Sequence, residues 1–261
     1  MSKIRSNFLK EKLANGLPVI GTWNTLNSPQ VTEVLAKSGF DFIIIDYEHG
    51  PPNFEKIIQF VNACEIYNCS PIIRIPTNSN WMTLQALDQG AHGVMVPGIS
   101  DFVSANDFIA SMKYYPRGNR GFTPFTKAGG FTNRDNDSYP SNANKFVVSS
   151  IIIENKEGLD NLDQILKIKE LDIVYFGAYD LSQSLGFPGD VKNPKVIYEI
   201  ENAVKKVTSS GKVAGGFVPQ NKEDIKWLLD LGMKFITYNV DSDLLYNSSR
   251  NKTIWFEKNF Q

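Results

Sequence analysis

The sequence has few of the residues that build disulfide frameworks, zinc centres or membrane spans. Its 261 residues include only two cysteines and two histidines, and no apolar run approaches the roughly 20 residues of a transmembrane helix. Cys64 and Cys69 have neither the spacing nor the further partners of a zinc site, so we expect reduced thiols that pack in the interior. Residues 1–16 contain no apolar segment of the signal-peptide type. Together these absences favour a cytoplasmic protein.

Neither sign of charge is in excess. Lysine and arginine number 27 against 28 aspartates and glutamates, which gives a net charge of −1 and a pI of about 6.2. The chain therefore lacks the electrostatic footprint of a nucleic-acid or membrane-surface protein, and small molecules are the favoured partners. Hydrophobic residues make up 42% and charged residues 21%, as in ordinary globular proteins, and the length fits one domain over residues 1–261.

Eight short apolar runs alternate with one-sided amphipathic segments along the chain. The runs predict strands at residues 18–23, 42–45, 71–76, 93–97, 146–153, 172–177, 213–218 and 234–238. Helices are expected between them, at residues 5–14 before the first strand, and from about residue 242 to 256 after the last. Such alternation predicts a parallel sheet with right-handed crossovers. Eight units of this length favour a (βα)₈ TIM barrel with an additional N-terminal helix. A Rossmann sheet is the rival, but residues 21–24 are not its GxGxxG turn.

One connection is unlike the others. Residues 116–145 are rich in glycine, proline and asparagine and show little apolar periodicity. A connection of this length inside a compact domain is commonly functional, so we expect it at the rim of the active site, with Arg120 as a substrate contact. Its place between the helix after the fourth strand and the fifth strand puts it at the opposite end of the barrel. It could then reach a site only by folding along the side or by crossing to a neighbouring subunit.

Ionisable residues follow or interrupt several of the predicted strands and mark a candidate site. In a barrel the carboxyl ends of the strands converge on one face, which would bring together His49, Arg74, Glu154 and Asp180. Glu154 and Asp180, on neighbouring strands, are suited to share one hard divalent cation, although Asp180 by itself also fits a helix N-cap. Arg74 stands inside an apolar strand and needs an anion or an oxygen-rich ligand, because a buried unpaired guanidinium is costly. His92 precedes its strand, so we expect it on the opposite face and assign it no role.

An ordered series of motifs along the chain resembles the HpcH/HpaI aldolase family. The series consists of DYEHGP at 46–51, Arg74, LDQGA at 87–91, YPRGNRG at 115–121, IEN at 153–155 and DLS at 180–182. It extends over nearly the whole chain. The resemblance implies a metal-dependent class II aldolase that handles pyruvate or a related 2-oxo acid enolate.

Carried over position by position, the resemblance implies a role for each motif residue. Glu154 and Asp180 become the ligands of Mg²⁺ or Mn²⁺. His49 becomes the acid/base, with Asp88 as its orienting partner.

The same resemblance assigns the substrate contacts. Arg74 binds the 2-oxo oxygen and stabilises the enolate, and backbone amides near Ala178 and Tyr179 hold the carboxylate. The partners implied are a small 2-oxo acid and an aldehyde. A homo-oligomer is also implied, commonly a hexamer, with the terminal helix packing on a neighbouring subunit, although its apolar residues would equally suit packing within the chain.

Three positions depart from the family pattern and leave alternatives open. Ile152 stands where the family usually has glutamine, Ala178 stands where it has proline, and residues 122–127 replace small residues and an arginine. The expected activity is cleavage or formation of a 4-hydroxy-2-oxo acid through a pyruvate enolate. The alternatives are an oxaloacetate-type decarboxylase, which would form the same enolate, and a 2-oxo acid-binding barrel without turnover.

Overall fold

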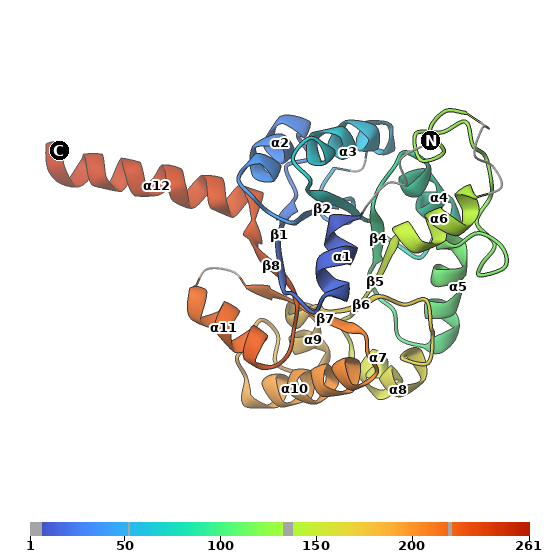
Figure 1. Ribbon diagram of the computed structural model, residues 1–261. Helices are drawn as coiled ribbons and strands as arrows, with labels where there is room; N and C mark the ends of the chain where they lie inside the picture. Colours follow the sequence, from blue (N-terminus) through green and yellow to red (C-terminus); the bar gives the residue numbers. More distant parts are fainter. Residues whose placement is uncertain (1–6, 52, 133–137, 219–220) are drawn as a thin grey trace.

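The computed structural model describes residues 7–51, 53–132, 138–218 and 221–261 and shows a closed barrel of eight parallel strands (Figure 1). Each strand pairs with the next along the chain, and β8 closes the barrel on β1. The predicted (βα)₈ architecture is confirmed. The strands are β1 (Val19–Asn24), β2 (Phe42–Asp46), β3 (Ser70–Arg74), β4 (Gly93–Val96), β5 (Val148–Ile153), β6 (Ile173–Phe176), β7 (Val213–Val218) and β8 (Phe235–Val240).

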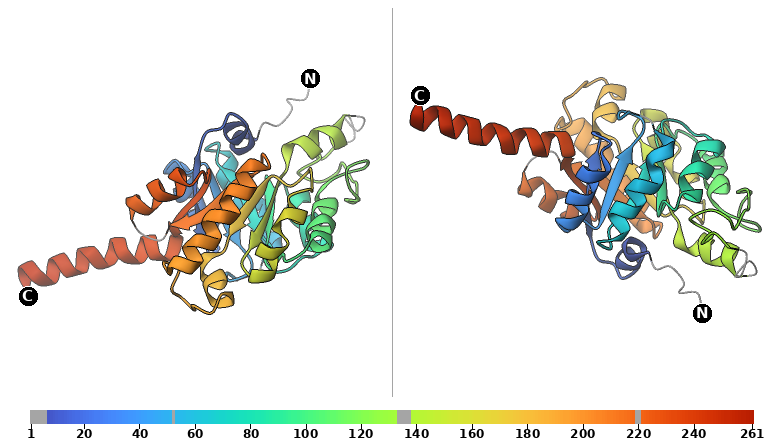
Figure 2. Two further views of the ribbon diagram at one scale, coloured as in Figure 1. Left: turned by 90° about the horizontal axis from the view of Figure 1, so that it is seen from below. Right: turned by 90° about the horizontal axis from the view of Figure 1, so that it is seen from above.

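Helices surround the barrel, and the predicted N-terminal helix α1 lies at the amino-terminal end of its strands (Figures 1 and 2). Before β5 the helices are α1 (Phe8–Ala14), α2 (Pro29–Lys37), α3 (Ile57–Glu65) after the 3₁₀ turn η1 (Phe54–Lys56), α4 (Asn80–Asp88), α5 (Phe102–Met112) and α6 (Tyr139–Phe146). After β5 they are α7 (Lys156–Asp160), α8 (Leu162–Ile165), α9 (Ala178–Ser184), α10 (Pro194–Ser209), α11 (Lys222–Asp230) and α12 (Asp241–Phe260). No described helix is long and apolar enough to cross a membrane.

Apolar side chains form two layers, one inside the barrel and one between the strands and the helices. Inside, the rings of Phe42 and Phe235 stack with centroids 3.9 Å apart, and Leu9 of α1 is fully buried against this layer. The space is so tight that a Cβ at Gly21 would lie 2.4 Å from the Phe42 ring. Cys64, a free thiol, belongs to the outer layer with Cys69, as predicted from their isolation in the sequence.

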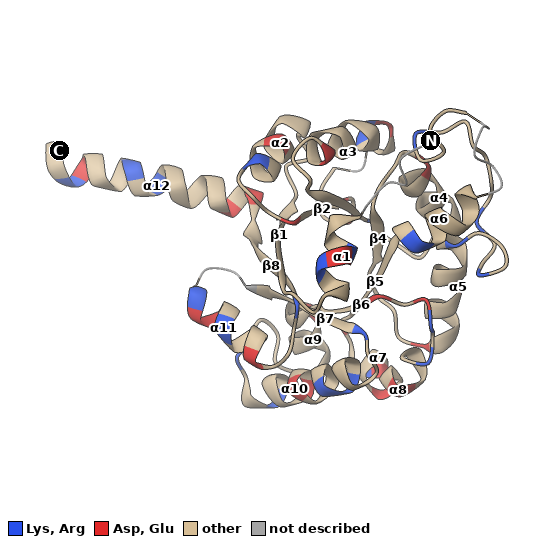
Figure 3. Cartoon of the chain, viewed as in Figure 1, with Lys and Arg blue, Asp and Glu red and all other residues tan. Residues whose placement is uncertain are grey.

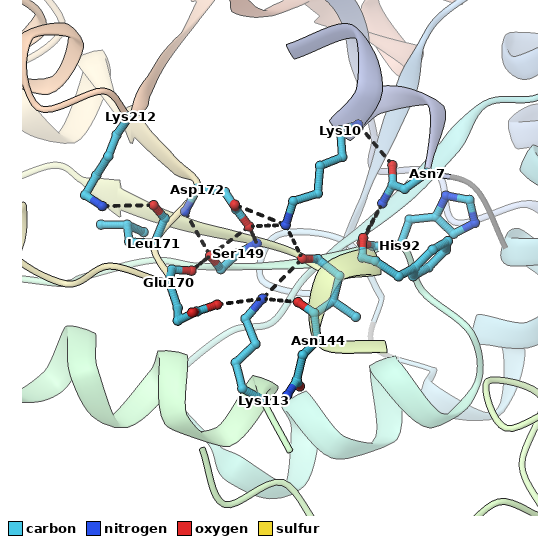
Figure 4. Close-up of polar contacts among 12 residues, drawn as sticks. Asn7, Lys10, His92, Lys113, Asn144, Ser149, Glu170, Leu171, Asp172 and Lys212 are labelled. Carbon is cyan, nitrogen blue, oxygen red and sulfur yellow. Dashed lines mark hydrogen bonds and ion pairs between the residues drawn. The ribbon is translucent and has the colours of Figure 1, made fainter. Parts of the chain in front are cut away.

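A polar network closes the amino end of the barrel below α1 (Figure 4). The fully buried Lys113 donates from Nζ to the carbonyl oxygens of Asn144 (2.9 Å) and Val147 (3.4 Å). Lys10 of α1 also donates to the Val147 carbonyl (3.0 Å) and to Asp172 Oδ2 (3.2 Å). Burial lowers the pKa of Lys113 to about 8, since desolvation disfavours the charged ammonium. These bonds tie α1, α5 and α6 to the base of the strands.

His92 lies on this amino-terminal face, as its position before β4 predicted. It is buried, and its two ring nitrogens lie 3.1 Å from Ser70 Oγ and 3.1 Å from Glu65 Oε1. The ring therefore has structural partners on the face opposite the ends of the strands where the candidate site was expected.

The connection of residues 116–145 also packs at the amino-terminal end. Arg120 Nη2 lies 2.6 Å from Asp88 Oδ1, and Lys127 Nζ lies 2.9 Å from Glu65 Oε2, at the last residues of α4 and α3. The connection contains α6, which its sequence did not reveal, and residues 133–137 lie outside the described part. Within one chain its described residues do not reach the carboxyl-terminal rim, so the predicted contact of Arg120 with substrate would require a neighbouring subunit.

The last helix, α12, projects away from the barrel instead of covering it (Figures 1 and 2). Several large apolar side chains on it are more than half exposed: Leu245, Tyr246, Trp255, Phe256 and Phe260. Elsewhere, acidic and basic residues are interspersed along the helices (Figure 3), in agreement with the balanced composition.

Candidate active site

A cavity of about 290 Å³ opens at the carboxyl-terminal ends of the strands. Six of the seven predicted site residues line it: His49, Arg74, Glu154, Ala178, Tyr179 and Asp180. They come from β3, from the ends of β2 and β5, and from the start of α9 after β6. Convergence of strand ends was the reason for grouping them, and the barrel brings them together as expected.

Asp88, the seventh, is not among the residues that line the cavity. It is the last residue of α4, which runs antiparallel to the strands and therefore ends at the amino-terminal face. Its carboxylate is paired with Arg120, and its carbonyl accepts from Ala128 N at 3.1 Å. Within one chain, Asp88 and His49 thus lie at opposite ends of the barrel.

Arg74 is held by two carboxylates of β2 and the loop that follows. Its Nε donates to Asp46 Oδ1 at 2.8 Å, its Nη2 bonds to Asp46 Oδ2, and its Nη1 lies 2.9 Å from Glu48 Oε2. Asp46 is 1% exposed and also accepts from the backbone N–H groups of Glu48 and His49. The guanidinium therefore has protein partners in addition to any ligand. The sequence reasoning missed Asp46, although Asp46 and Arg74 are directly paired in the register of β2 and β3.

Burial raises the pKa of Glu48, and the positive charge of Arg74 opposes this shift. His49 also lowers the pKa of Glu48, while Asp46 and Asp180 raise it. The pKa of Glu48 thus depends on the charges of four of its neighbours, Asp46, His49, Arg74 and Asp180.

An aromatic floor supports Arg74 from inside the barrel. The Trp23 ring lies under the guanidinium, with its centroid 4.3 Å from Cζ, a cation–π contact. Trp23 Nε1 donates to Thr237 Oγ1 (3.2 Å), which lies 2.5 Å from the Tyr175 hydroxyl and donates to the Gly216 carbonyl at 3.2 Å. The Thr237 hydroxyl thus makes three hydrogen bonds, and one of them fixes the Trp23 indole that contacts Arg74.

Glu154 and Asp180 form the acidic side of the cavity. Glu154 Oε1 accepts from Gly98 N at 2.7 Å. Burial raises the pKa of Glu154, the Gly98 amide opposes the shift, and the nearby carboxylates of Glu48 and Asp180 raise it further. A Cβ on residue 177 would lie 3.0 Å from Glu154 Oε2, so Gly177 leaves the carboxylate its space.

Asp180 lies in the first turn of α9, and Gly177 occupies the N-cap position. The interpretation of Asp180 as a helix N-cap is therefore wrong, and its side chain lines the cavity instead.

A divalent cation fits this acidic side. Two carboxylates supply hard oxygen ligands and would be relieved of their mutual repulsion by such an ion. In the described part of the chain, no group of three or more histidine, cysteine, aspartate and glutamate side chains is arranged to hold a metal. An ion here would thus have Glu154 and Asp180 as its ligands, with water or substrate oxygens at its other positions.

Two of the departures from the family pattern lie in the cavity itself. Ile152 is 2% exposed, lines the cavity and pairs with Tyr175 in the register of β5 and β6. Ala178, at the start of α9, also lines it. Ile152 makes the wall more apolar than the glutamine of the family pattern would, and Ala178 restricts the backbone less than proline would. Neither residue adds an ionisable group to the cavity.

Comparison with known proteins gives a consistent answer. The model of the HpcH/HpaI aldolase/citrate lyase family matches residues 19–248. A hydroxypyruvate/pyruvate aldolase of Roseobacter denitrificans is 32% identical over 246 residues, covering 94% of this chain and 95% of the relative. A 4-hydroxy-2-oxo-heptane-1,7-dioate aldolase of Salmonella arizonae is 34% identical over 239 residues, covering 92% and 90%.

Solved structures agree. An HpcH/HpaI aldolase/citrate lyase family protein from Burkholderia cenocepacia has a TM-score of 0.90 at 26% identity, covering 97% of this chain and all of that one. A citrate lyase β subunit from M. tuberculosis, solved with oxaloacetate and magnesium, has a TM-score of 0.54 at 14% identity, covering 87% of this chain and 93% of that one. The second likeness shows the fold alone.

Proposed function

This chain belongs to the HpcH/HpaI aldolase/citrate lyase family, and we propose that it is a carbon–carbon lyase that cleaves or forms a 4-hydroxy-2-oxo acid through a pyruvate enolate. One observation carries the proposal: a single cavity holds a positioned guanidinium, a histidine and two neighbouring carboxylates. This is the set of groups that an enolate reaction needs. Negative charge develops on one oxygen, and a proton must be moved at another.

Glu154 and Asp180 would hold a divalent cation, Mg²⁺ or Mn²⁺, because their hard oxygen ligands suit ions of this kind. When bound, the cation supplies Lewis-acid stabilisation of the negative charge that develops on the 2-oxo acid. The neighbouring carboxylates of Glu48 and Asp180 raise the pKa of Glu154, and such an ion would offset this effect.

Arg74 would donate to the 2-oxo oxygen and stabilise it as charge develops. Its guanidinium is fixed on three sides by Asp46, Glu48 and Trp23, so little reorganisation is needed during the reaction. The backbone amides of Ala178 and Tyr179, in the first turn of α9, have no acceptors within the helix and would bind the substrate carboxylate.

His49 would be the acid/base of the reaction. In cleavage it takes the proton of the 4-hydroxyl group, the C3–C4 bond breaks, and the aldehyde leaves while the electron pair of that bond forms the enolate. Protonation of C3 then gives pyruvate. In synthesis the same residue returns the proton to the alkoxide of the new hydroxyl group.

Asp88 can orient His49 only if a second copy of the chain supplies it, because the two lie at opposite ends of one barrel. We therefore propose a homo-oligomer in which the exposed apolar residues of α12, such as Trp255 and Phe256, pack on a neighbour. Light scattering coupled to gel filtration tests this directly. A fully active monomer would contradict it.

The function is tested by pyruvate release from a panel of 4-hydroxy-2-oxo acids and from oxaloacetate, with Mg²⁺ or Mn²⁺ and with EDTA. The aldolase is supported if pyruvate is released from a 4-hydroxy-2-oxo acid and EDTA abolishes this release. Turnover of oxaloacetate alone would identify a decarboxylase. Binding without turnover of any substrate would identify a 2-oxo acid-binding barrel.

A further inference from the structure

The cavity has two chemically different sides. The charged side is formed by Asp46, Arg74, Glu154 and Asp180, with His49 beside them. The rest of the lining is mainly apolar and aromatic and includes Tyr179, Phe217 and Val240, with Trp23 beneath Arg74. The 2-oxo acid head belongs on the charged side under the proposed function, so the rest of the substrate meets the apolar wall.

Among the described residues that line the cavity, no positively charged side chain is available to pair with a second substrate carboxylate. Arg74 is the only lysine or arginine among the described residues that line the cavity, and two carboxylates already hold it. Three lining carboxylates face that single guanidinium, so a bound divalent cation would balance the site without leaving an excess of positive charge. Lys192 lines the adjoining cavity, but its Nζ is paired with Asp224 Oδ1 at 3.2 Å. Arg120, which a neighbouring subunit would bring to the site together with Asp88, is paired with that aspartate at 2.6 Å.

The apolar wall is built to contact a hydrocarbon chain. The rings of Tyr179 and Phe217 lie with centroids 6.3 Å apart, and Trp23 is fixed in place through Thr237. A carboxylate buried against such a wall would lose its hydration without gaining a partner, which is strongly unfavourable. A methylene chain there gains the free energy of leaving water.

We propose that the substrate chain beyond the 2-oxo acid head is uncharged and apolar, so the site prefers monocarboxylic 4-hydroxy-2-oxo acids to dicarboxylic ones. The preference would set this chain apart from its Salmonella relative, whose name specifies a heptane-1,7-dioate. The inference rests on the proposed function for the placement of the 2-oxo acid head.

The test compares two ligands that differ only at the far end of the chain, 2-oxohexanoate and 2-oxohexanedioate. Calorimetry on the full-length protein with Mg²⁺ measures both dissociation constants without any turnover. We expect 2-oxohexanoate to bind at least about tenfold more tightly, the scale on which a pocket discriminates a poorly matched group. Equal binding, or tighter binding of the diacid, would overturn the inference.

A positive charge introduced into the apolar wall should shift the preference from 2-oxohexanoate toward 2-oxohexanedioate. Phe217→Arg supplies the missing cation, so the ratio of the two dissociation constants should move toward the diacid by at least about tenfold. Tyr198→Ala, at a 62% exposed position on α10 outside the cavity, is the matched control and should leave the ratio unchanged. A ratio that Phe217→Arg does not move would show that this wall does not contact the substrate chain.

A separate measurement distinguishes failure of this inference from failure of the proposed function. Exchange of the C3 protons of pyruvate in D₂O reports enolate formation and needs no second substrate. Exchange together with a preference for the diacid would overturn the inference and leave the lyase intact. A preference for 2-oxohexanoate without exchange would overturn the lyase and leave the binding preference standing.

Discussion

Replacing Asp46 with asparagine should destabilise the barrel and disturb the site together. Asp46 is 1% exposed and accepts four hydrogen bonds, two from Arg74 and two from backbone amides. The amide keeps the shape of the side chain but removes the charge that faces a buried guanidinium. Breaking a buried pair by removing one partner costs about 3–5 kcal/mol, and the remaining contact of Arg74 with Glu48 places our estimate at about 3 kcal/mol.

For a chain of this length, a loss of that size lowers the melting temperature by about 6–12 °C. Thermal unfolding and urea titration of Asp46→Asn would measure it. Asp160→Asn is the control, because its pair with Lys156 is 61–63% exposed and should contribute little to stability. If Asp46→Asn and the control destabilised the protein equally, the buried pair would not have the role inferred from its geometry.

Three further outcomes are expected. His49→Ala should lower kcat by about 10²–10⁴-fold while the protein still binds metal, and near-normal turnover would exclude His49 as the acid/base. Thr237→Val removes the acceptor that fixes Trp23 and should lower kcat by about tenfold or more, whereas Thr237→Ser should retain activity; equal losses in both variants would argue against this role. Because the pKa of Lys113 is about 8 in the folded protein and 10.5 is its ordinary value, the unfolded chain binds the proton between these values. Stability should therefore rise with pH in that window by up to about 1.4 kcal/mol per pH unit, and urea titrations of Lys113→Met should lack this contribution.

The barrel itself was predictable because its signal is repeated along the chain. Eight apolar runs, each followed by a one-sided segment, have few arrangements other than a closed parallel sheet, and errors at single boundaries do not change that result. The one connection without periodicity concealed α6 (Tyr139–Phe146), whose sequence has a proline at its second position and contains two asparagines. Tertiary packing against α5 through Lys113 and Asn144, which no local pattern shows, supports this helix.

The site was predictable in its members but not in its internal contacts. Strand ends brought Glu154 and Asp180 together, yet the N-cap interpretation of Asp180 was wrong because the N-cap is Gly177, three residues earlier than the sequence pattern indicated. Arg74 was recognised as needing an anion, but the choice of Asp46 depends on strand register, which one sequence does not specify. Family resemblance paired Asp88 with His49, and only the direction of α4 shows that one chain cannot form that pair.

The proposed reaction passes through an enolate and depends on a divalent cation that Glu154 and Asp180 would hold. Its most direct test is deuterium exchange into C3 of pyruvate, followed by NMR after exhaustive chelation and again after addition of Mg²⁺ or Mn²⁺. We expect chelation to abolish exchange, either ion to restore it, and Glu154→Gln to lack it while remaining folded. Full exchange in EDTA would contradict a metal-dependent enolate reaction.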